Sequence, residues 1–545
     1  MLIFKKKAMK NIYKSILMCS ALVTFSACTD LEENLVGEIQ TEFNGSEPSF
    51  GNFDGGGGGP SDAVSSAYAQ LRESGTANHG GYWSVQSVST DEMAVTQKGG
   101  DWFDGGIWID MHRHTYPPSN GPINGAWTGQ YAAIGACNTA LASGDLDDNQ
   151  TAQVRALRAF FYYRLVDMFG RVKIVTTPGV DAPQATRVQV YNFVEAELLA
   201  SLGITAVSPT MDLSNSPLTT EVNPYRINQY AALGLLAKLY LNAEVFAGTP
   251  KYSEAAIAAS YVIDNGSYIL CDTGCSVPNP AQRPSVASDP DELEGYAAVF
   301  APNNQNNPEL IWSVAYDNVT GANMNFAQMT LHYSSQFTWN IQNQPWNGYS
   351  ALEEFYNSYD DADKRKANNF LVGPQLDYEG SVILDYAAPI DELELNYSTD
   401  INELEPDASR KGGARLGKFS FRQGQRDNMD NDYPIIRLGD LYLIRAEGLA
   451  RAAGNWSLAL PDVNTIRARA GLTTALTTLT ADEFLAERGR EMFMEVTRRQ
   501  DLIRFGKFND AWWEKPASAP FRNLFPIPQE QISAPGSGLT QNPGY

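Results

Sequence analysis

The sequence of 545 residues lacks the short motifs that mark common catalytic sites. It contains no Gly-x-Ser-x-Gly elbow, no His-Glu-x-x-His and no complete Gly-x-x-x-x-Gly-Lys-Ser/Thr phosphate loop. Paired carboxylates of a glycoside hydrolase lie far apart in sequence, so 63 acidic residues neither support nor exclude such a pair. The missing motifs favour a binding protein over an enzyme.

Histidine is also scarce, which limits metal chemistry. Two of the four histidines, His112 and His114, lie close together, but no carboxylate or third ligand follows at a recognisable spacing. We interpret them as a hydrogen-bonded structural pair. The acidic stretch 427–432 resembles a calcium loop without its central Gly, and we expect a solvated loop there. No metal or other cofactor is predicted.

Basic residues are few compared with acidic ones, and the formal net charge is −23. Residues 1–27 carry five Lys and no acid, so the rest of the chain is more negative still. Such a charge repels the phosphate backbone and makes nucleic acid a poor partner. Neutral ligands fit best, although a local Arg such as Arg113 or Arg422 could admit an acidic one.

Long apolar runs are missing too, and the one notable run lies at the N-terminus. Several Lys residues precede the apolar residues 16–25, a signal-peptide pattern too short for a membrane span of roughly 20 residues. The run ends in Ser26, Ala27 and Cys28, which resembles the lipobox of bacterial lipoproteins. We expect residues 1–27 to be removed, Cys28 to be lipidated, and 28–60 to form a tether. The alternative is an ordinary signal peptide with a chance cysteine.

The three cysteines beyond Cys28 predict little chemistry. Cys271 and Cys275 could close a disulfide across a short loop, as an exported protein permits. Cys137 lies in an apolar helical context and is expected to be a small core residue.

Helical periodicity comes in sets separated by short Gly or Pro breaks. It predicts helices over 127–141 and 151–169, then over 226–246 and 253–263. A third set covers 434–453, 457–470 and 481–499. The short breaks predict helical hairpins. We therefore predict a mainly α fold, a tetratricopeptide-like scaffold in one unit over 61–545, with long loop-rich insertions and a few short strands.

The insertions, 43–122 and 266–418, are rich in Gly, Asn, Pro, Asp and aromatic residues with little periodicity. Residues 309–315 are expected to form a strand. Loops this long within a compact domain are usually functional or disordered, and their aromatic content argues against disorder.

Aromatic side chains within these insertions suggest a ligand-binding surface. A flat ring can stack on the apolar face of a sugar while nearby polar groups bind the hydroxyls. The stacking candidates are Trp83, Trp102, Trp108, Trp339 and Trp346. Asn52 and Asp54, in a Gly-flanked segment, are the polar candidates. The alternative is that most of these rings pack the loops onto the helices.

Motifs spread over the chain resemble the SusD/RagB family of nutrient-binding lipoproteins. They are DWFDGG at 101–106, RALRAFFYYRLVDMFG at 155–170, NPELIWS at 307–313, YPIIRLGDLYLIRAE at 433–447, VNTIRARAG at 463–471, RRQDLIRFG at 498–506, FPIP at 525–528 and QNPGY at 541–545. The order of these motifs after a lipobox carries the resemblance, more than any one of them.

The resemblance implies a tetratricopeptide-like helical scaffold whose loop-rich face binds ligand. It also implies an outer-membrane, cell-surface location with a lipid anchor, and a partner, a SusC-like TonB-dependent transporter that receives captured polysaccharide or oligosaccharide. Peptide capture by the same scaffold is the alternative function. The helical motifs of the family are structural and do not identify ligand residues.

Overall fold

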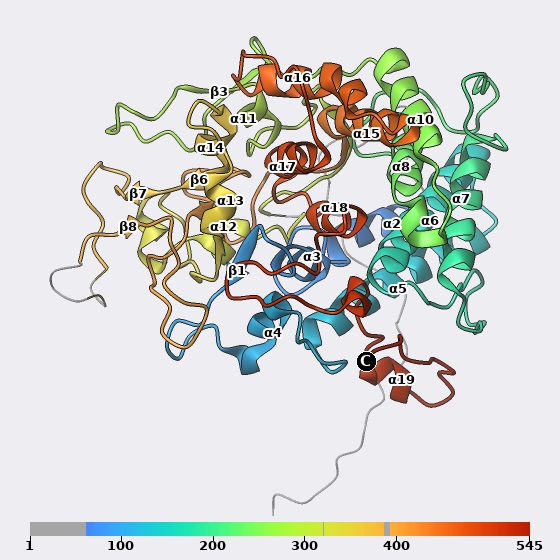
Figure 1. The fold of residues 1–545 in the computed structure, drawn as a ribbon, viewed down its shortest axis with the longest axis horizontal. Helices are drawn as coiled ribbons and strands as arrows, with labels where there is room; N and C mark the ends of the chain where they lie inside the picture. Colours follow the sequence, from blue (N-terminus) through green and yellow to red (C-terminus); the bar gives the residue numbers. More distant parts are fainter. Residues whose placement is uncertain (1–61, 320, 386–387, 389–392) are drawn as a thin grey trace, which may run out of the picture. The chain divides into compact units, whose positions relative to one another are not determined.

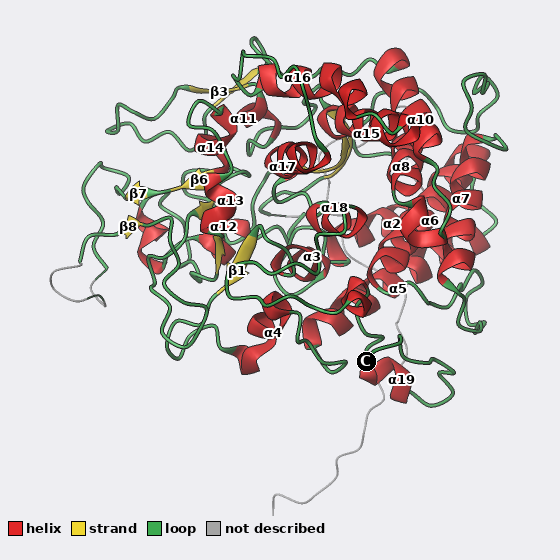
Figure 2. Ribbon diagram, in the orientation of Figure 1, coloured by secondary structure: helices red, strands yellow, loops and turns green. Residues whose placement is uncertain are grey.

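Helices dominate the N-terminal and C-terminal thirds of the described chain, whereas loops and two-stranded sheets dominate its middle (Figures 1 and 2). The computed structural model describes residues 62–319, 321–385, 388 and 393–545. These residues fall within one compact unit, Asn52–Tyr545. Cys28, Asn52 and Asp54 lie outside the described residues.

The scaffold is a series of helices in which each packs against the next. It runs α2 (Asp62–Glu73), α5 (Gly121–Ala142), α6 (Asp148–Met168), α7 (Arg187–Leu202), α8 (Gln229–Leu241), α10 (Tyr252–Asn265) and α15 (Leu438–Ala453). The short connection 143–147 brings α5 and α6 side by side, as the predicted hairpin requires. Two of the three predicted helical sets are thus confirmed, and α7 is an additional member.

Side-chain caps fix where these helices begin. Asp147 and Gln150 form a reciprocal capping box at the start of α6, and Thr186 and Gln189 form another at α7. Asn228 caps α8 by accepting from the Ala231 backbone N–H. These caps satisfy backbone donors that would otherwise lack partners.

The third predicted set begins differently from the prediction, because residues 433–437 form a strand. β10 (Tyr433–Arg437) pairs antiparallel with β4 (Leu310–Val314), and Tyr433 faces Val314. Pro434 and the β-branched Ile435 and Ile436 suit an extended backbone better than a helix. The predicted strand at 309–315 is confirmed, and the helix begins at Leu438 rather than at 434.

The remaining strands form two-stranded antiparallel sheets. They are β1 (Met93–Val95) with β5 (Tyr349–Ala351), β2 (Ser276–Pro278) with β3 (Glu292–Glu294), β6 (Phe370–Leu371) with β9 (Arg415–Leu416), and β7 (Gly373–Pro374) with β8 (Asn396–Tyr397). None of the described strands joins a larger sheet.

Short helices fill the rest of the fold. The α-helices are α3 (Tyr82–Val88), α4 (Ile107–Arg113), α9 (Ala243–Ala247), α11 (Tyr296–Val299), α12 (Phe326–Thr330), α13 (Glu353–Asn357), α14 (Lys364–Asn369), α16 (Leu460–Arg469), α17 (Ala481–Met492), α18 (Arg498–Arg504) and α19 (Gln529–Ser533). The 3₁₀ helices are η1 (Asp104–Gly106), η2 (Tyr333–Phe337), η4 (Trp456–Ala459) and η5 (Pro520–Asn523). The described part of the predicted insertion 43–122 is therefore more helical than its weak periodicity suggested.

No helix in the described residues is both long and apolar enough to cross a bilayer.

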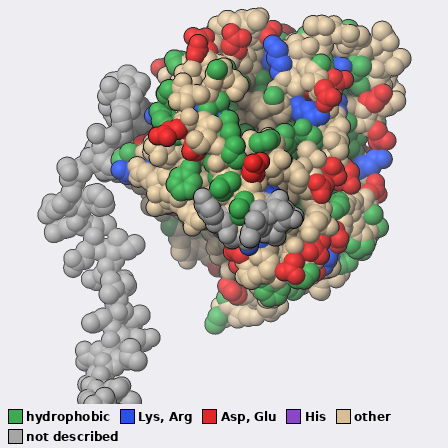
Figure 3. Space-filling view, turned by 90° about the vertical axis from the view of Figure 1, so that its left-hand side faces the viewer, with side chains coloured by type: hydrophobic (Ala, Val, Ile, Leu, Met, Phe, Trp, Pro, Cys, Tyr) green, Lys and Arg blue, Asp and Glu red, His purple; other side chains and the backbone are tan. Residues whose placement is uncertain are grey.

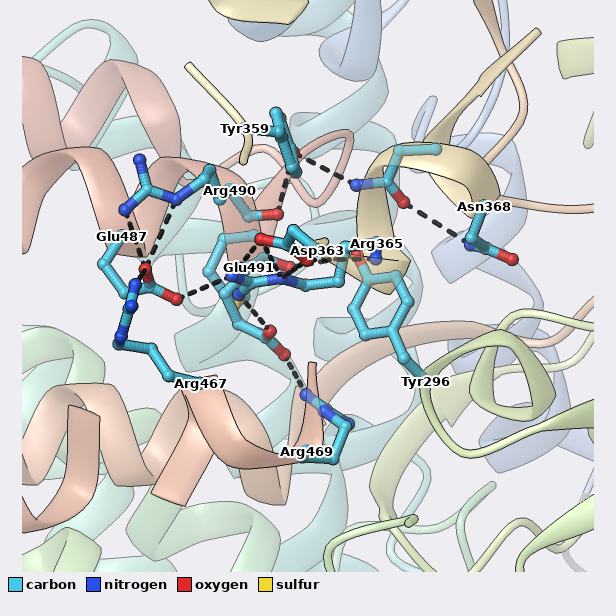
Figure 4. Close-up of polar contacts among 12 residues, drawn as sticks. Tyr296, Tyr359, Asp363, Arg365, Asn368, Arg467, Arg469, Glu487, Arg490 and Glu491 are labelled. Atoms are coloured by element: carbon cyan, nitrogen blue, oxygen red, sulfur yellow. Dashed lines mark hydrogen bonds and ion pairs between the residues drawn. The ribbon is translucent and has the colours of Figure 1, made fainter. Parts of the chain in front are cut away.

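A buried network of ion pairs attaches the loop-rich middle to the C-terminal helices (Figure 4). Arg365 of α14 contacts Asp363 at 2.7 Å, Glu487 at 2.7 Å and Glu491 at 2.9 Å. The network continues through Arg437, which binds Glu491 at 2.7 Å, and these side chains are almost completely buried. Burial alone would raise the pKa of Glu491, but the surrounding guanidinium groups outweigh it and hold that pKa well below its ordinary value.

Candidate functional site

Exposed aromatic rings mark the candidate site. In the part of the chain that the structure describes, four large aromatic side chains are exposed: Phe103, Phe337, Trp346 and Tyr378. All four lie in the two segments predicted as ligand-binding insertions. Outside these two segments, the large apolar side chains that are exposed in the described residues are scattered aliphatic ones, such as Leu449 and Leu458. Flat, exposed rings are therefore confined to the loop-rich segments.

Trp83 and Trp108 are core residues, which corrects their prediction as stacking platforms. Trp83 is fully buried on α3, and its indole N–H donates to the Met494 carbonyl at 2.9 Å. Trp108 is buried on α4, and its indole N–H donates to Asp104 at 3.2 Å. Neither ring offers a face to a ligand, because each lies on a helix whose apolar side packs inward.

Trp339 is also buried, although it belongs to the loop that carries the site. Its ring meets Phe421 edge to face, with centroids 4.8 Å apart. The ring anchors the loop, as the alternative interpretation of these aromatics expected. The prediction of Trp339 as a stacking residue is therefore wrong.

Trp102 is buried, and it supports its neighbour Trp346. Its indole N–H donates to the Trp346 carbonyl at 2.6 Å. The ring lies so close to Gly348 that a Cβ at that position would be 2.4 Å from a ring carbon. The turn that carries Trp346 is thus fixed against Trp102, which itself adopts a left-handed backbone with φ 62°.

Trp346 is the one predicted stacking residue that the structure leaves exposed, at 36%. Its backbone N–H donates to the Gln328 carbonyl at 2.7 Å, so the ring projects from a fixed turn. Three exposed amides, Gln342, Asn343 and Gln344, precede it in the same loop and are separated from it by Pro345. Amides donate and accept hydrogen bonds, as sugar hydroxyls do. We call Trp346, residues 342–344 and the exposed carboxylates Asp101 and Asp104 the Trp346 site.

The polar groups of this site are connected to the loop frame. Asn343 donates to Asp427 at 2.8 Å, which leaves its carbonyl oxygen and second N–H for a ligand. Asp101 accepts from the Tyr333 hydroxyl and from the Trp102 backbone N–H. The turn around residue 101 and helix η2 are thereby joined beside Trp346.

His79 lies against Trp346 and was overlooked as a site residue. Its ring centroid is 5.9 Å from that of Trp346, and its Nδ1 lies 2.9 Å from the Tyr349 hydroxyl. Burial lowers the pKa of His79, and the nearby Asp104 opposes this only partly. The imidazole is therefore neutral near pH 7 and adds no positive charge to the site.

A hollow of about 650 Å³ lies elsewhere, beside the disulfide that joins Cys271 and Cys275. The disulfide left open in the sequence interpretation is thus formed. The hollow is lined by the loops 269–277 and 303–308, and no aromatic ring contributes to its wall. It offers backbone and amide groups without a stacking surface.

The histidine pair has the structural role expected for it. His112 lies 2.8 Å from the Trp513 carbonyl, and His114 lies 2.9 Å from the Ser89 carbonyl. Over the described residues, no three His, Cys, Asp or Glu side chains are placed to hold a metal ion together. Cys137 is buried in the core, as predicted.

Two family models match this chain. One, described as the SusD family, matches residues 395–519, and the other, described as starch-binding associating with outer membrane, matches 65–241. Together they cover more than half of the sequence. This chain belongs to the SusD/RagB family. The resemblance drawn from its motifs is thereby confirmed.

Curated relatives of the family are distant in sequence. Starch-binding protein SusD of Bacteroides thetaiotaomicron is 25% identical over 440 residues, 73% of each chain. SusD-like protein P2 of Formosa agariphila is 23% identical over 562 residues, 96% of this chain and 98% of the relative.

Solved structures of SusD-like proteins share the fold. A laminarin binding SusD-like protein is 23% identical, with a TM-score of 0.65 over 89% of this chain and 98% of the other. Surface glycan-binding protein A from Bacteroides thetaiotaomicron, in complex with laminarihexaose, is 21% identical, with a TM-score of 0.67 over 88% and 98%. The predicted helical scaffold with loop insertions is confirmed by these similarities.

Sequence reasoning missed the exposed Phe103, Phe337 and Tyr378. One signal for Trp346 was available in the polar Gln-Asn-Gln-Pro that precedes it. Trp108, in contrast, is followed three residues later by Met111, a spacing typical of the buried face of a helix.

Proposed function

We propose that this protein binds neutral glycan chains at the Trp346 site and acts as a capture protein rather than an enzyme. The observation that carries the proposal is the exposed Trp346 ring, fixed on its turn beside three exposed amides. An aromatic face with convergent polar groups is what a sugar-binding surface requires. The family relatives named for starch and laminarin support a glycan ligand.

The charge of the chain favours a neutral glycan over an acidic one. The two arginines that could have reversed this preference are both paired with carboxylates. Arg113 binds Glu405 and lies 3.3 Å from Glu514, and Arg422 lies 2.7 Å from Asp430. With these cations neutralised and the net charge at −23, a polyanionic glycan would meet repulsion.

The cellular setting is part of the same proposal. A lipid on Cys28 would anchor the protein at the outer membrane, and the family model described as associating with that membrane supports this location. We propose a SusC-like TonB-dependent transporter as the partner that receives the glycan. Three of the relatives reported above are named for starch, laminarin or glycan binding and none for peptide binding, so the peptide alternative gains no support.

Affinity electrophoresis tests the proposal. The purified chain from Thr29 onward is run through gels that contain single neutral or acidic polysaccharides. We expect retardation by at least one neutral glycan and its loss in Trp346→Ala, because the stacking face is removed. Leu458→Ala, which removes an exposed apolar side chain from η4, is the matched control and should be retarded like the wild type.

Retardation by acidic glycans alone would contradict the predicted preference for neutral chains. Equal retardation of Trp346→Ala and wild type would contradict the site.

A further inference from the structure

A second pair of exposed rings lies on the same loop region as the Trp346 site. Phe337 is 61% exposed and Tyr378 is 37% exposed. The Tyr378 backbone N–H donates to the Phe337 carbonyl at 2.9 Å, so the two residues are neighbours although they lie far apart in sequence. Single exposed apolar residues are common, but two exposed aromatic residues joined through their backbones suggest a binding surface.

Both rings project from backbone that is fixed by hydrogen bonds. On the Phe337 side, Ser335 lies 2.6 Å from the Tyr397 hydroxyl, which also accepts from the His332 backbone N–H at 2.9 Å. On the Tyr378 side, the Asp377 carboxylate accepts from the Glu379 and Ser381 backbone N–H groups and closes a turn. A backbone that is already fixed reduces the conformational entropy lost when a ligand stacks on these rings.

Helix η2 connects this pair with the Trp346 site. Tyr333, at its first residue, donates to Asp101 beside Trp102, which in turn holds the Trp346 turn. Phe337 is the last residue of η2. At about 2 Å per residue in a 3₁₀ helix, the backbone of Phe337 lies roughly 8 Å beyond that of Tyr333. The two exposed surfaces therefore flank a common element.

The surroundings of the second pair suit a neutral polar ligand. The exposed Glu379 and Asn340 and the partly exposed Gln336 lie beside it in sequence. The nearby Arg283 is neutralised by Asp289 at 2.8 Å and donates to the Leu376 carbonyl. Figure 3 shows apolar and acidic side chains interspersed on the face that carries β7 and β8, with few basic ones.

We propose that Phe337 and Tyr378 form a second aromatic platform, which contacts sugar residues further along the glycan chain bound at Trp346. This inference rests on the proposed function and deepens it. A chain long enough to reach both surfaces gains contacts that a short fragment cannot make. The protein therefore selects long chains over short fragments of the same glycan.

Isothermal titration calorimetry with graded lengths of the retained glycan tests the platform. For the wild type, affinity should rise with chain length until both surfaces are reached. For Phe337→Ala/Tyr378→Ala, affinity for long chains should fall about tenfold, equivalent to about 1.4 kcal/mol, because both stacking faces are removed. Affinity for the shortest bound fragment should be unchanged.

Two further variants control this experiment. Phe337→Trp retains a flat ring and should keep the preference for long chains. Leu449→Ala/Leu458→Ala removes two exposed apolar side chains, from α15 and η4, and should bind like the wild type.

The outcomes separate the platform from the proposed function. If the wild type binds no glycan, the proposed function and the platform are both overturned. If Trp346→Ala abolishes binding but the double Ala variant binds long chains as tightly as the wild type, only the platform is overturned. The platform is equally overturned if the double variant keeps its glycan affinity and instead loses copurification with a membrane transporter, which would make this face a protein-docking surface.

Discussion

At the scale of single residues, Trp102 and Trp346 show how two neighbouring aromatics take different roles. The Trp102 ring is buried, and its indole N–H donates to the backbone carbonyl of Trp346. The Trp346 ring remains exposed. Gly348 lies beneath the buried ring, where a side chain has no room. The exposed ring is therefore positioned by a packed pair and not by its own contacts alone.

Gly348→Ala is expected to weaken glycan binding although it leaves Trp346 in place. The new methyl group would meet three Trp102 ring carbons at 2.4–2.8 Å, so the ring must shift and release the Trp346 carbonyl. We expect a loss of affinity of about tenfold or more, equivalent to about one lost aromatic contact. Calorimetry with the glycan retained by the wild type measures it.

Gly100→Ala is the matched control for this change. Gly100 lies in the same turn region as Trp102, and a methyl group there would meet no atom within 4 Å. Its binding should equal that of the wild type. If Gly348→Ala also bound normally, the supporting role of Trp102 would be refuted.

Burial is the residue property that sequence patterns predicted least well. A hydrogen bond to Met494 fixes Trp83, and a hydrogen bond from Trp102 fixes the turn of Trp346. Both contacts join segments that lie hundreds of residues apart in sequence. No local pattern encodes such contacts. The helical position of Trp108 could have indicated burial, whereas Phe337 and Tyr378 are joined by a backbone hydrogen bond that only the folded structure reveals.

At the scale of elements, the long helices were predictable because their periodicity, caps and breaks agree. The capping boxes at α6 and α7 follow directly from Asp147/Gln150 and Thr186/Gln189. The strand β10 was mistaken for helix because buried apolar residues without alternation do not distinguish the two. The short sheets escaped prediction, since their partners come from distant parts of the loops.

The ion-pair network is expected to be essential for joining α14 to α17. Arg365→Met would leave Asp363, Glu487 and Glu491 buried with fewer positive partners. Removing one partner of a buried pair typically costs about 3–5 kcal/mol. Urea denaturation should show a loss of this size in the free energy of unfolding.

Lys507→Met provides the contrast for this measurement. Lys507 pairs with Asp482 at 3.3 Å on the surface, where ion pairs contribute only about 0–1 kcal/mol. A loss in Arg365→Met no larger than that in Lys507→Met would contradict the role given to the network.

At the scale of the whole molecule, buried neutral histidines should make stability depend on pH. Burial lowers the pKa values of His112 and His332 to about 4, against an ordinary value of about 6.5. The unfolded chain then binds protons that the folded chain does not, so stability falls as the pH falls from about 6.5 towards 4. Each such histidine contributes on the order of 3 kcal/mol over this range.

His112→Gln tests this dependence. Its side-chain amide can still donate to the Trp513 carbonyl, but it does not titrate. Chemical denaturation at several pH values between 7 and 4.5 should show a shallower loss of stability in the variant than in the wild type. If the free energy of unfolding fell equally with pH in the two proteins, His112 would not contribute to the pH dependence of stability.

The most direct test of glycan capture at Trp346 is a crystal structure of the protein with an oligosaccharide of the retained glycan. We expect a sugar ring stacked on Trp346, with its hydroxyls hydrogen-bonded to the amides of residues 342–344. A long oligosaccharide should extend towards Phe337 and Tyr378. A sugar bound instead in the hollow beside Cys271 and Cys275, with Trp346 free, would contradict the account.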